Sequence, residues 1–203
     1  MFQSFTESAR PEQGPARLTA LRAVMAKQGF SGFLIPRADA HQGEYVAPHD
    51  ERLQWLTGFT GSAGFCAALL DRAGVFIDGR YRTQVKGQVA LSHFTPVPWP
   101  EIKLGPWLAD ALSQGGRVAY DPWLHTPDQI TEAEKALENS GITLEPSENL
   151  VDAIWPDQPA PPMGAVSVYP EDLAGETHAS KRARLAKTLR SLGQKSMVIT
   201  LPD

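Results

Sequence analysis

Short apolar segments and polar turns alternate along the chain, and their order predicts an α/β fold. Apolar residues recur at helical spacing from Leu18 to Met25, and Gly29 is placed to end that helix. Residues 30–35 form an apolar run, closed by a proline, that is typical of a buried strand. Two further apolar runs, residues 65–70 and 75–77, flank a short turn and predict a hairpin in a buried sheet.

The second half of the chain continues the alternation of helices and strands. Residues 94–99 carry Pro96 and Pro98, which restricts that run to an edge strand or a covering loop. Thr126 and Gln129 have the spacing of a capping box at the start of a helix. Further helices are expected over residues 81–90 and 104–112, and further strands over residues 117–120 and 142–144. Together these elements predict a mixed sheet flanked by helices.

Four prolines between residues 156 and 162 predict a linker between two domains, because proline stiffens the backbone and removes donors. Beyond it, an amphipathic helix is expected over residues 173–192 and a strand over residues 196–201. Because one helix and one strand do not bury their own apolar face, we expect the second domain to be incomplete. The predicted divisions are a disordered N-terminus (1–15), a first domain (16–155), a linker (156–164) and the start of a second domain (165–203). Trp155, beside the linker, is expected to pack between domains.

Composition and charge narrow the classes of function. The net charge is −4 and no basic tract stands out, which argues against nucleic-acid binding. Cys66 is the single cysteine, so no internal disulfide forms and a reducing compartment is indicated. No apolar run approaches the roughly 18 residues of a membrane span, and the N-terminus lacks the apolar core of a signal peptide. We therefore expect a cytoplasmic protein that binds neither nucleic acid nor a membrane.

Motifs for catalysis or metal binding are absent from the sequence. None of the five histidines lies in an HExxH pattern, and Cys66 has no CxxC partner. Ser62 lies in a small-residue loop without the G-x-S-x-G pattern of a nucleophile elbow, so close packing explains that loop better. We predict no catalytic residue and no metal ligand in this chain.

A longer pattern carries a family resemblance. The sequence GFTGSAG of residues 58–64, followed by a hairpin and DGRY at residues 78–81, resembles the N-terminal domain of Xaa-Pro aminopeptidases in the creatinase/prolidase family. The similarity continues upstream in ADAHQGEYVAPHDERLQWLT and downstream in NLVDAIWPDQPAPP, and covers roughly residues 18–203. It points to the three-domain cytosolic type of aminopeptidase P. It also implies the creatinase N-terminal fold, a ribonuclease-H-like mixed sheet of about six strands, followed by the start of a similar domain.

The resemblance also implies a function for the parent protein. Such enzymes remove the N-terminal residue from peptides with proline in second position. They use two divalent metals, usually manganese, held by two Asp, one His and two Glu in a separate C-terminal domain. No stretch of this chain matches that domain, so the resemblance implies a non-catalytic part that shapes the substrate cleft and aids assembly. Its partners would be proline-containing peptides and its own catalytic domain, and the resemblance allows a homodimer. A stand-alone binding module, or the N-terminal domain of a prolidase or creatinase, are the alternatives.

The polar loop of residues 37–52 and the turn of residues 78–81 are the candidate contacts with substrate. In this family the N-terminal domain leans over the catalytic domain, which makes Arg80, His41 and Tyr45 candidates for a substrate-facing rim. An arginine suits this role because its planar fork can meet a peptide carbonyl or carboxylate. The alternative is a polar network that only fixes the loops, with Asp50 as a helix cap and Asp78 paired with Arg80 or Arg52.

Overall fold

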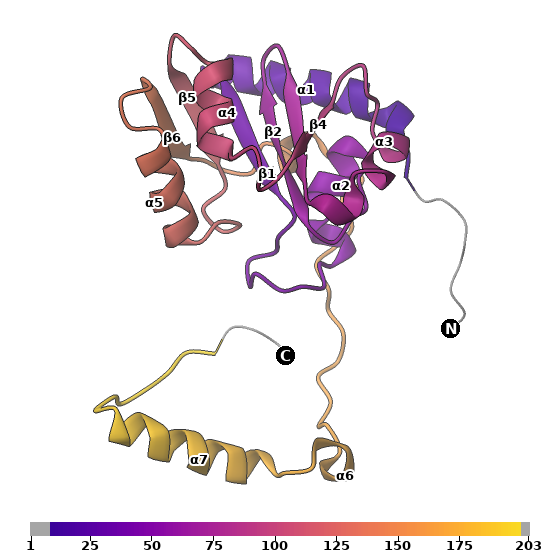
Figure 1. Cartoon of the computed structure of the whole chain (residues 1–203). Coiled ribbons are helices and arrows are strands. Elements are labelled where there is room, and N and C mark those ends of the chain that lie inside the picture. The colour runs from indigo at the N-terminus through magenta and orange to yellow at the C-terminus, as the bar shows by residue number, and fades with distance from the viewer. Residues whose placement is uncertain (1–8, 200–203) are drawn as a thin grey trace. The chain divides into compact units, whose positions relative to one another are not determined.

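The first part of the chain is built on a six-stranded sheet with helices on both faces (Figure 1). The computed structural model describes residues 9–199, which form two compact units, one ending at Pro161 and the other beginning at Pro162. The strand order is β4-β3-β2-β1-β5-β6. The strands are β1 (Gly32–Pro36), β2 (Gly64–Leu69), β3 (Ala73–Ile77), β4 (Thr95–Pro98), β5 (Gly116–Tyr120) and β6 (Ile142–Pro146). The predicted mixed α/β fold is therefore confirmed.

Five of the six strands run in the same direction. β2 is antiparallel to both of its neighbours, β1 and β3, so those two strands are parallel to each other. β4 is parallel to β3, β5 to β1, and β6 to β5. The carboxyl ends of these five strands therefore meet at one edge of the sheet, which we call the carboxyl edge.

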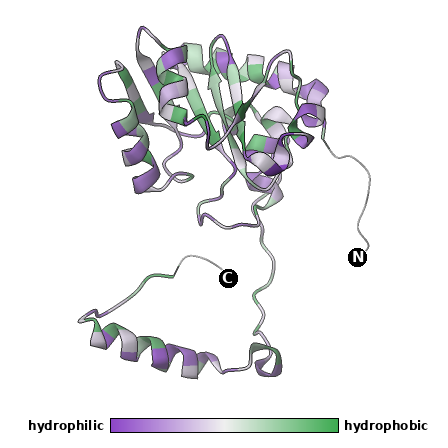
Figure 2. Cartoon of the chain, in the orientation of Figure 1, coloured by the Kyte–Doolittle hydropathy of each residue, from purple (hydrophilic) through white to green (hydrophobic). Residues whose placement is uncertain are grey.

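The helices divide between the two faces of the sheet. They are α1 (Gly14–Gln28), α2 (Arg52–Thr57), α3 (Gln84–Gln88), α4 (Leu104–Ala111) and α5 (Pro127–Ala136), with 3-10 turns at Pro11–Gln13, Pro48–Asp50, Gly79–Tyr81 and Asp152–Ile154. Helices α1 to α3 pack on one face, whereas Leu108 of α4 and Leu137, directly after α5, pack on the other. A hydrophobic core lies on each face of the sheet. Alternate residues of each central strand contribute to one core or the other, because successive side chains of a strand point to opposite faces. In Figure 2 the strands carry most of the hydrophobic colour.

Several helices begin or end at the glycines and capping residues that the sequence predicts for those positions. Gly29 closes α1 and Gly58 closes α2, both with positive φ angles of 73° and 90°. Thr126 and Gln129 form the predicted capping box at α5, with the Gln129 N–H donating to Thr126 Oγ1 at 3.3 Å. The proline-bearing run becomes β4, an edge strand, as predicted.

Three expectations differ from the structure of the first unit. Disorder over residues 1–15 is wrong for residues 9–15, because Ala9 is buried and Pro11–Gln13 form a 3-10 turn ahead of α1; residues 1–8 lie outside the described residues. The helix expected over residues 81–90 is shorter, because Gly79–Tyr81 form a separate 3-10 turn. Trp155, expected to pack between domains, is part of the core of the first unit and stacks on Trp55, with 5.1 Å between ring centroids.

The second unit contains two helices, α6 (Glu171–Ala174) and α7 (His178–Ser191), in place of the single helix expected over residues 173–192. Gly175 adopts a φ of 71° and ends α6, and Thr177 caps α7 by accepting the Ser180 N–H at 3.0 Å. Residues 196–199 are irregular, so the strand expected over residues 196–201 is not formed there; its last two residues lie outside the described part. No residue described in this unit is buried.

Candidate functional site

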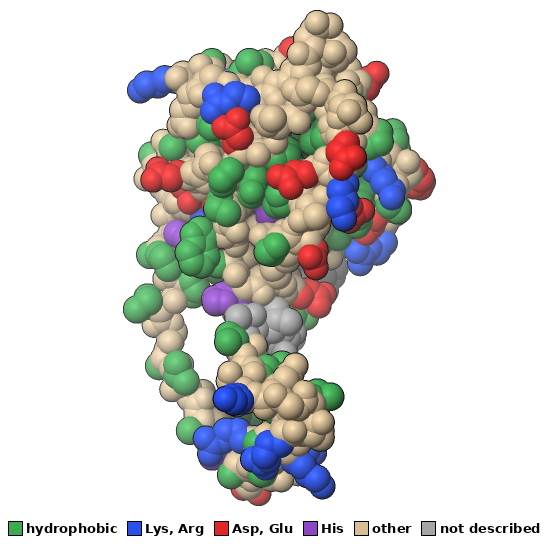
Figure 3. Space-filling view, turned by 90° about the vertical axis from the view of Figure 1, so that its left-hand side faces the viewer, with side chains coloured by type: hydrophobic (Ala, Val, Ile, Leu, Met, Phe, Trp, Pro, Cys, Tyr) green, Lys and Arg blue, Asp and Glu red, His purple; other side chains and the backbone are tan. Residues whose placement is uncertain are grey.

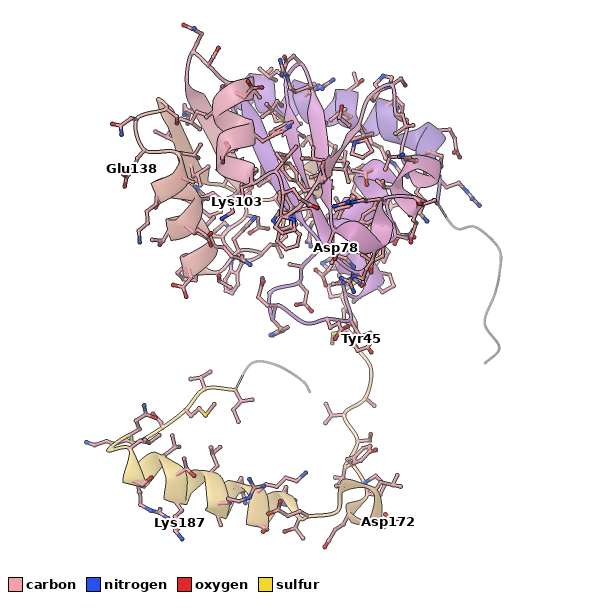
Figure 4. All side chains as sticks on the ribbon, viewed as in Figure 1. Tyr45, Asp78, Lys103, Glu138, Asp172 and Lys187 are labelled. Carbon is pink, nitrogen blue, oxygen red and sulfur yellow. The ribbon has the colours of Figure 1, made fainter. Side chains whose placement is uncertain are left out.

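The carboxyl edge brings together the two segments that sequence analysis selects. The loop after β1 and the turn after β3 both leave this edge because β1 and β3 are parallel. The loop that precedes β2, residues 60–63, reaches the same edge because β2 runs the opposite way. Figure 4 labels Tyr45 in the first loop and Asp78 in the turn, at the lower side of the first unit. Sheet topology thus joins segments about thirty residues apart.

Arg80 is held in an outward-facing position by Asp78. The Asp78 carboxylate accepts the Arg80 backbone N–H at 2.9 Å, the Nε at 3.1 Å and the Nη2 at 2.7 Å. These bonds to Arg80 hold the pKa of Asp78 below its ordinary value. The Arg80 side chain is still 65% exposed, whereas that of Asp78 is 19% exposed. The guanidinium is therefore oriented by its carboxylate and remains open to a further acceptor.

Arg37 organises the loop that follows β1. Its side chain is 14% exposed and donates to the Glu44 carbonyl at 2.9 Å and to the Ser62 carbonyl at 3.3 Å, and Nη2 lies 3.5 Å from Glu51. Burial raises the pKa of Glu51, although the nearby Arg37 acts in the opposite direction. The negative charge of Glu44 in turn helps to raise the pKa of Arg80, after the larger effect of Asp78. The loop and the turn are thus within electrostatic reach of each other.

His41 and Tyr45 are both exposed on this loop. The Asp39 carboxylate accepts the backbone N–H groups of His41 at 2.9 Å and Gly43 at 3.0 Å, which shapes the bend. Tyr45 is 86% exposed. Neither ring forms a hydrogen bond with a described residue. Their side chains are therefore available for contact, but no packing or hydrogen bond fixes them as Asp78 fixes Arg80.

Ser62 is a partner of Tyr81 in this structure. Its hydroxyl lies 2.6 Å from the Tyr81 hydroxyl, and the Tyr81 ring meets Phe59 edge-on at 5.5 Å between centroids. A Cβ on Gly61 would lie 2.2 Å from the Phe59 ring, so only glycine fits at this position. The small residues thus permit close packing between this loop and the turn that carries Arg80.

Arg52 has a structural role in a network behind the loop. Its side chain is 6% exposed and forms a bidentate pair with Asp152, at 2.6 and 2.8 Å, and a bond to Asp50 at 3.0 Å. Gln158 Nε2 donates both to Asp152 and to the His49 carbonyl at 3.0 Å. The predicted cap by Asp50 is therefore wrong, since Asp50 pairs with Arg52 and α2 has no side-chain cap. Of the two partners considered for Asp78, the structure selects Arg80.

The described residues contain neither a cluster of metal-ligating side chains nor a helix that could span a membrane. Between residues 9 and 199, no three His, Cys, Asp or Glu side chains gather in a way that could hold a metal ion. This part of the chain therefore does not fit the metal pair that the resemblance implies for the parent. Within the same range, every helix is too short or too polar to cross a bilayer.

A family model settles the classification of the chain. The model for the creatinase/prolidase N-terminal domain matches residues 17–154. The chain belongs to this family. The matched range ends just before Trp155 and covers the whole six-stranded sheet.

Individual relatives extend the similarity beyond this domain. A probable Xaa-Pro aminopeptidase P from Aspergillus niger is 34% identical over 197 residues, covering 92% of this chain and 31% of the relative. Human Xaa-Pro aminopeptidase 2 is 37% identical over 166 residues, covering 81% of this chain and 25% of the relative. The chain therefore spans about a third or less of the relatives it matches. The first unit ends at Pro161, so a match over 92% of the chain extends into the second unit.

Solved structures agree with this assignment. An X-prolyl aminopeptidase from Caenorhabditis elegans, described as a cytosolic enzyme with a di-nuclear active site, superposes with a TM-score of 0.79 at 29% identity. That similarity covers 89% of this chain and 32% of the nematode enzyme. The N-terminal domain of the peptidase PepQ from Mycobacterium tuberculosis superposes with a TM-score of 0.53 at 26% identity, over 68% of this chain and 98% of that domain. The resemblance to the creatinase N-terminal domain of Xaa-Pro aminopeptidases is thus confirmed.

Proposed function

We propose that this chain is the non-catalytic N-terminal part of a metal-dependent Xaa-Pro aminopeptidase. The parent would hydrolyse the bond after the first residue of peptides that carry proline in second position. The supporting observation is the length of the similarity: Xaa-Pro aminopeptidase relatives match 92% of the chain and the nematode enzyme covers 89%. The PepQ domain covers 68%, so an aminopeptidase P parent is favoured over a prolidase.

The reacting metals would be held outside these residues. The described residues bring together no metal-binding group, and the nematode relative has a di-nuclear active site. We expect two divalent ions, with manganese as the first candidate, and a cytoplasmic location. Proline peptides need a dedicated enzyme because proline lacks an N–H and restricts the residue before it. When bound, divalent metals in such a site supply an activated water and polarise the carbonyl.

The carboxyl edge would contribute contacts to the bound peptide. Arg80 is the leading residue, because Asp78 orients its guanidinium while leaving 65% of the side chain exposed. A planar guanidinium can donate to a peptide carbonyl or to a carboxylate without a proton transfer. His41 and Tyr45 would line the same rim, with weaker and less fixed contacts. The chain by itself would release no amino acid from an Xaa-Pro peptide.

The test uses the longer protein that contains this chain, loaded with manganese. Arg80→Ala should lower kcat/KM for an Arg-Pro-Pro peptide by about 10- to 100-fold, since a lost charged hydrogen bond costs about 1.5–3 kcal/mol. Because Arg80 is exposed, its loss should change the free energy of unfolding by less than about 0.5 kcal/mol. Arg72→Ala is the matched control: Arg72 pairs with Asp71 at the opposite end of the hairpin. Equal effects of the two variants would refute the role of Arg80, and no cleavage by the wild-type longer protein would refute the proposed activity.

A further inference from the structure

A cavity of about 630 Å³ opens at the carboxyl edge, on the face of the sheet that carries α4 and α5. Its volume lies within the range of about 300–1,000 Å³ that is usual for ligand sites. Figure 3 views the first unit from the side of α5 and shows hydrophobic side chains at the surface among charged ones. The apolar lining comes from the sheet, both helices and the loop after β4, through Leu34, Phe65, Trp99, Leu104, Ile130 and Ala133.

The cavity exists because two short helices cover this face incompletely. Helices α4 and α5 approach each other so closely that a Cβ on Gly105 would lie 2.5 Å from the Cβ of Ala136. Beside that contact, Phe65 is only half-buried, although it stacks on the buried Phe76 with 4.4 Å between ring centroids. Trp99, at the end of β4, is 38% exposed. The fold therefore presents a preformed apolar hollow rather than a closed core.

The polar groups that line the cavity can accept a hydrogen bond from a ligand and can also donate one to it. His125 Nδ1 donates to the Asp121 carbonyl at 3.0 Å, which leaves Nε2 as an acceptor, and burial lowers the pKa of this ring and favours its neutral form. Lys103 is exposed just before α4 and forms no ion pair with any residue in the described range. Glu132, on α5, is the carboxylate of the lining. One available cation beside an apolar hollow complements the terminal carboxylate of a peptide that ends in an apolar residue.

The cavity adjoins the turn that carries Arg80. The Trp99 backbone N–H donates to the Ile77 carbonyl at 2.9 Å, and Ile77 directly precedes the Asp78 turn. Since β3 and β4 are neighbouring parallel strands, their carboxyl ends lie side by side. The turn that carries Arg80 and the Trp99 side of the cavity therefore lie at neighbouring strand ends of the carboxyl edge.

We propose that this cavity is a subsite for an apolar residue at the carboxyl end of a peptide, with Lys103 binding the terminal carboxylate. This inference rests on the proposed function, because it assigns the far end of the same peptide. The apolar residue replaces water against Phe65, Leu104 and Ile130, so affinity should follow its apolar area. The parent would accordingly prefer short peptides with a large apolar last residue.

The binding test uses the 203-residue chain, labelled with ¹⁵N, and NMR titration with synthetic peptides. The probe is Ala-Pro-Gly-Gly-Phe, compared with the same peptide ending in Gly and with its C-terminal amide. The Phe peptide should shift the amide signals of Phe65, Trp99 and Leu104. Replacing Phe by Gly should weaken binding at least about tenfold, and amidation about threefold, as expected for loss of apolar burial and of an exposed ion pair.

Two pairs of variants locate the bound peptide. Ala133→Phe fills the cavity and should weaken binding at least about tenfold, whereas Glu134→Phe adds the same ring at an exposed position of α5 outside the lining. Lys103→Gln should reduce affinity to that of the amidated peptide, whereas Lys135→Gln should not. The Lys103 pair keeps the test valid if Ala133→Phe fails to fold, because Lys103 is exposed.

Equal affinity for the Phe and Gly peptides, or unchanged binding by Ala133→Phe and Lys103→Gln, would overturn the proposal. The proposal would also be overturned if the chain forms a dimer that Ala133→Phe dissociates while peptide binding is unchanged. That result would assign the cavity to contact with a second copy of the chain. Ala-Ala-Gly-Gly-Phe separates this inference from the proposed function. Equal binding of that peptide supports the subsite even if the longer protein shows no preference for proline.

Discussion

Arg52 offers a direct test of what holds the C-terminal part of the first unit in place. Its guanidinium joins the start of α2 to Asp152, one hundred positions later in the chain, and to Asp50. Arg52→Gln removes the cation and leaves two carboxylates close together. The segment that carries Asp152 would then be held by the hydrogen bond from Gln158 and by the Trp55–Trp155 stack, without the ion pair.

The expected loss of stability follows from the burial of this pair. Removing one partner of a buried ion pair costs about 3–5 kcal/mol. The Asp152 side chain is 34% exposed, so water can partly replace the lost bonds and the cost should fall to about 2–3 kcal/mol. For a unit of this size, that corresponds to a Tm lower by about 5–10 °C. Urea unfolding followed by tryptophan fluorescence measures the change, because Trp55 and Trp155 report on the same region.

The control for this prediction is Arg72→Gln. Arg72 also pairs with an aspartate, Asp71, but both side chains are about half exposed or more, at 49% and 63%. Exposed pairs contribute about 0–1 kcal/mol, so this variant should unfold close to the wild type. The double variant Arg52→Gln/Asp152→Asn should recover part of the loss, since Asp50 is then the one charged partner that remains of the two. Equal stability of Arg52→Gln and Arg72→Gln would show that the network does not stabilise the fold.

Two further predictions concern buried positions. Burial raises the pKa of Cys66 to about 12, so the folded chain should not react with a thiol reagent at pH 8, and the urea-unfolded chain should. The thiol of the unfolded chain has a pKa of about 8.5, so above that pH the unfolded state binds fewer protons than the folded state. The free energy of unfolding should therefore decline above that pH in the wild type, and less so in Cys66→Ala. Parallel pH profiles of the two proteins would contradict this. Gly58→Ala should destabilise by more than about 1 kcal/mol, because φ is 90° and the new Cβ would lie 2.3 Å from the Gln88 carbonyl oxygen. Gly87→Ala, in open space within α3, should be neutral or stabilising by up to about 1 kcal/mol, and a reversed order in thermal unfolding would refute the argument.

The sequence by itself determined most of the elements in the first unit. Periods of apolar residues identify strands and helices because each face must be buried, and local signals such as Gly29, Gly58 and the Thr126 capping box set their ends without help from distant residues. The edge position of β4 also follows locally, since its prolines remove backbone donors. The same local signals were misread beyond the linker, where Gly175 divides the helix expected over residues 173–192.

Only the tertiary structure decided how the candidate residues meet. The DGRY motif points to Arg80, and the structure adds that Asp78 orients its guanidinium and that Glu44, in the loop after β1, lies within electrostatic reach of it. The partner of Arg52 lies one hundred positions away, and no periodicity or short motif carries that information. The cavity likewise depends on how far two short helices extend over the sheet, which is a property of packing between distant segments. Local chemistry therefore fixes elements, whereas strand direction and long-range contacts fix the site.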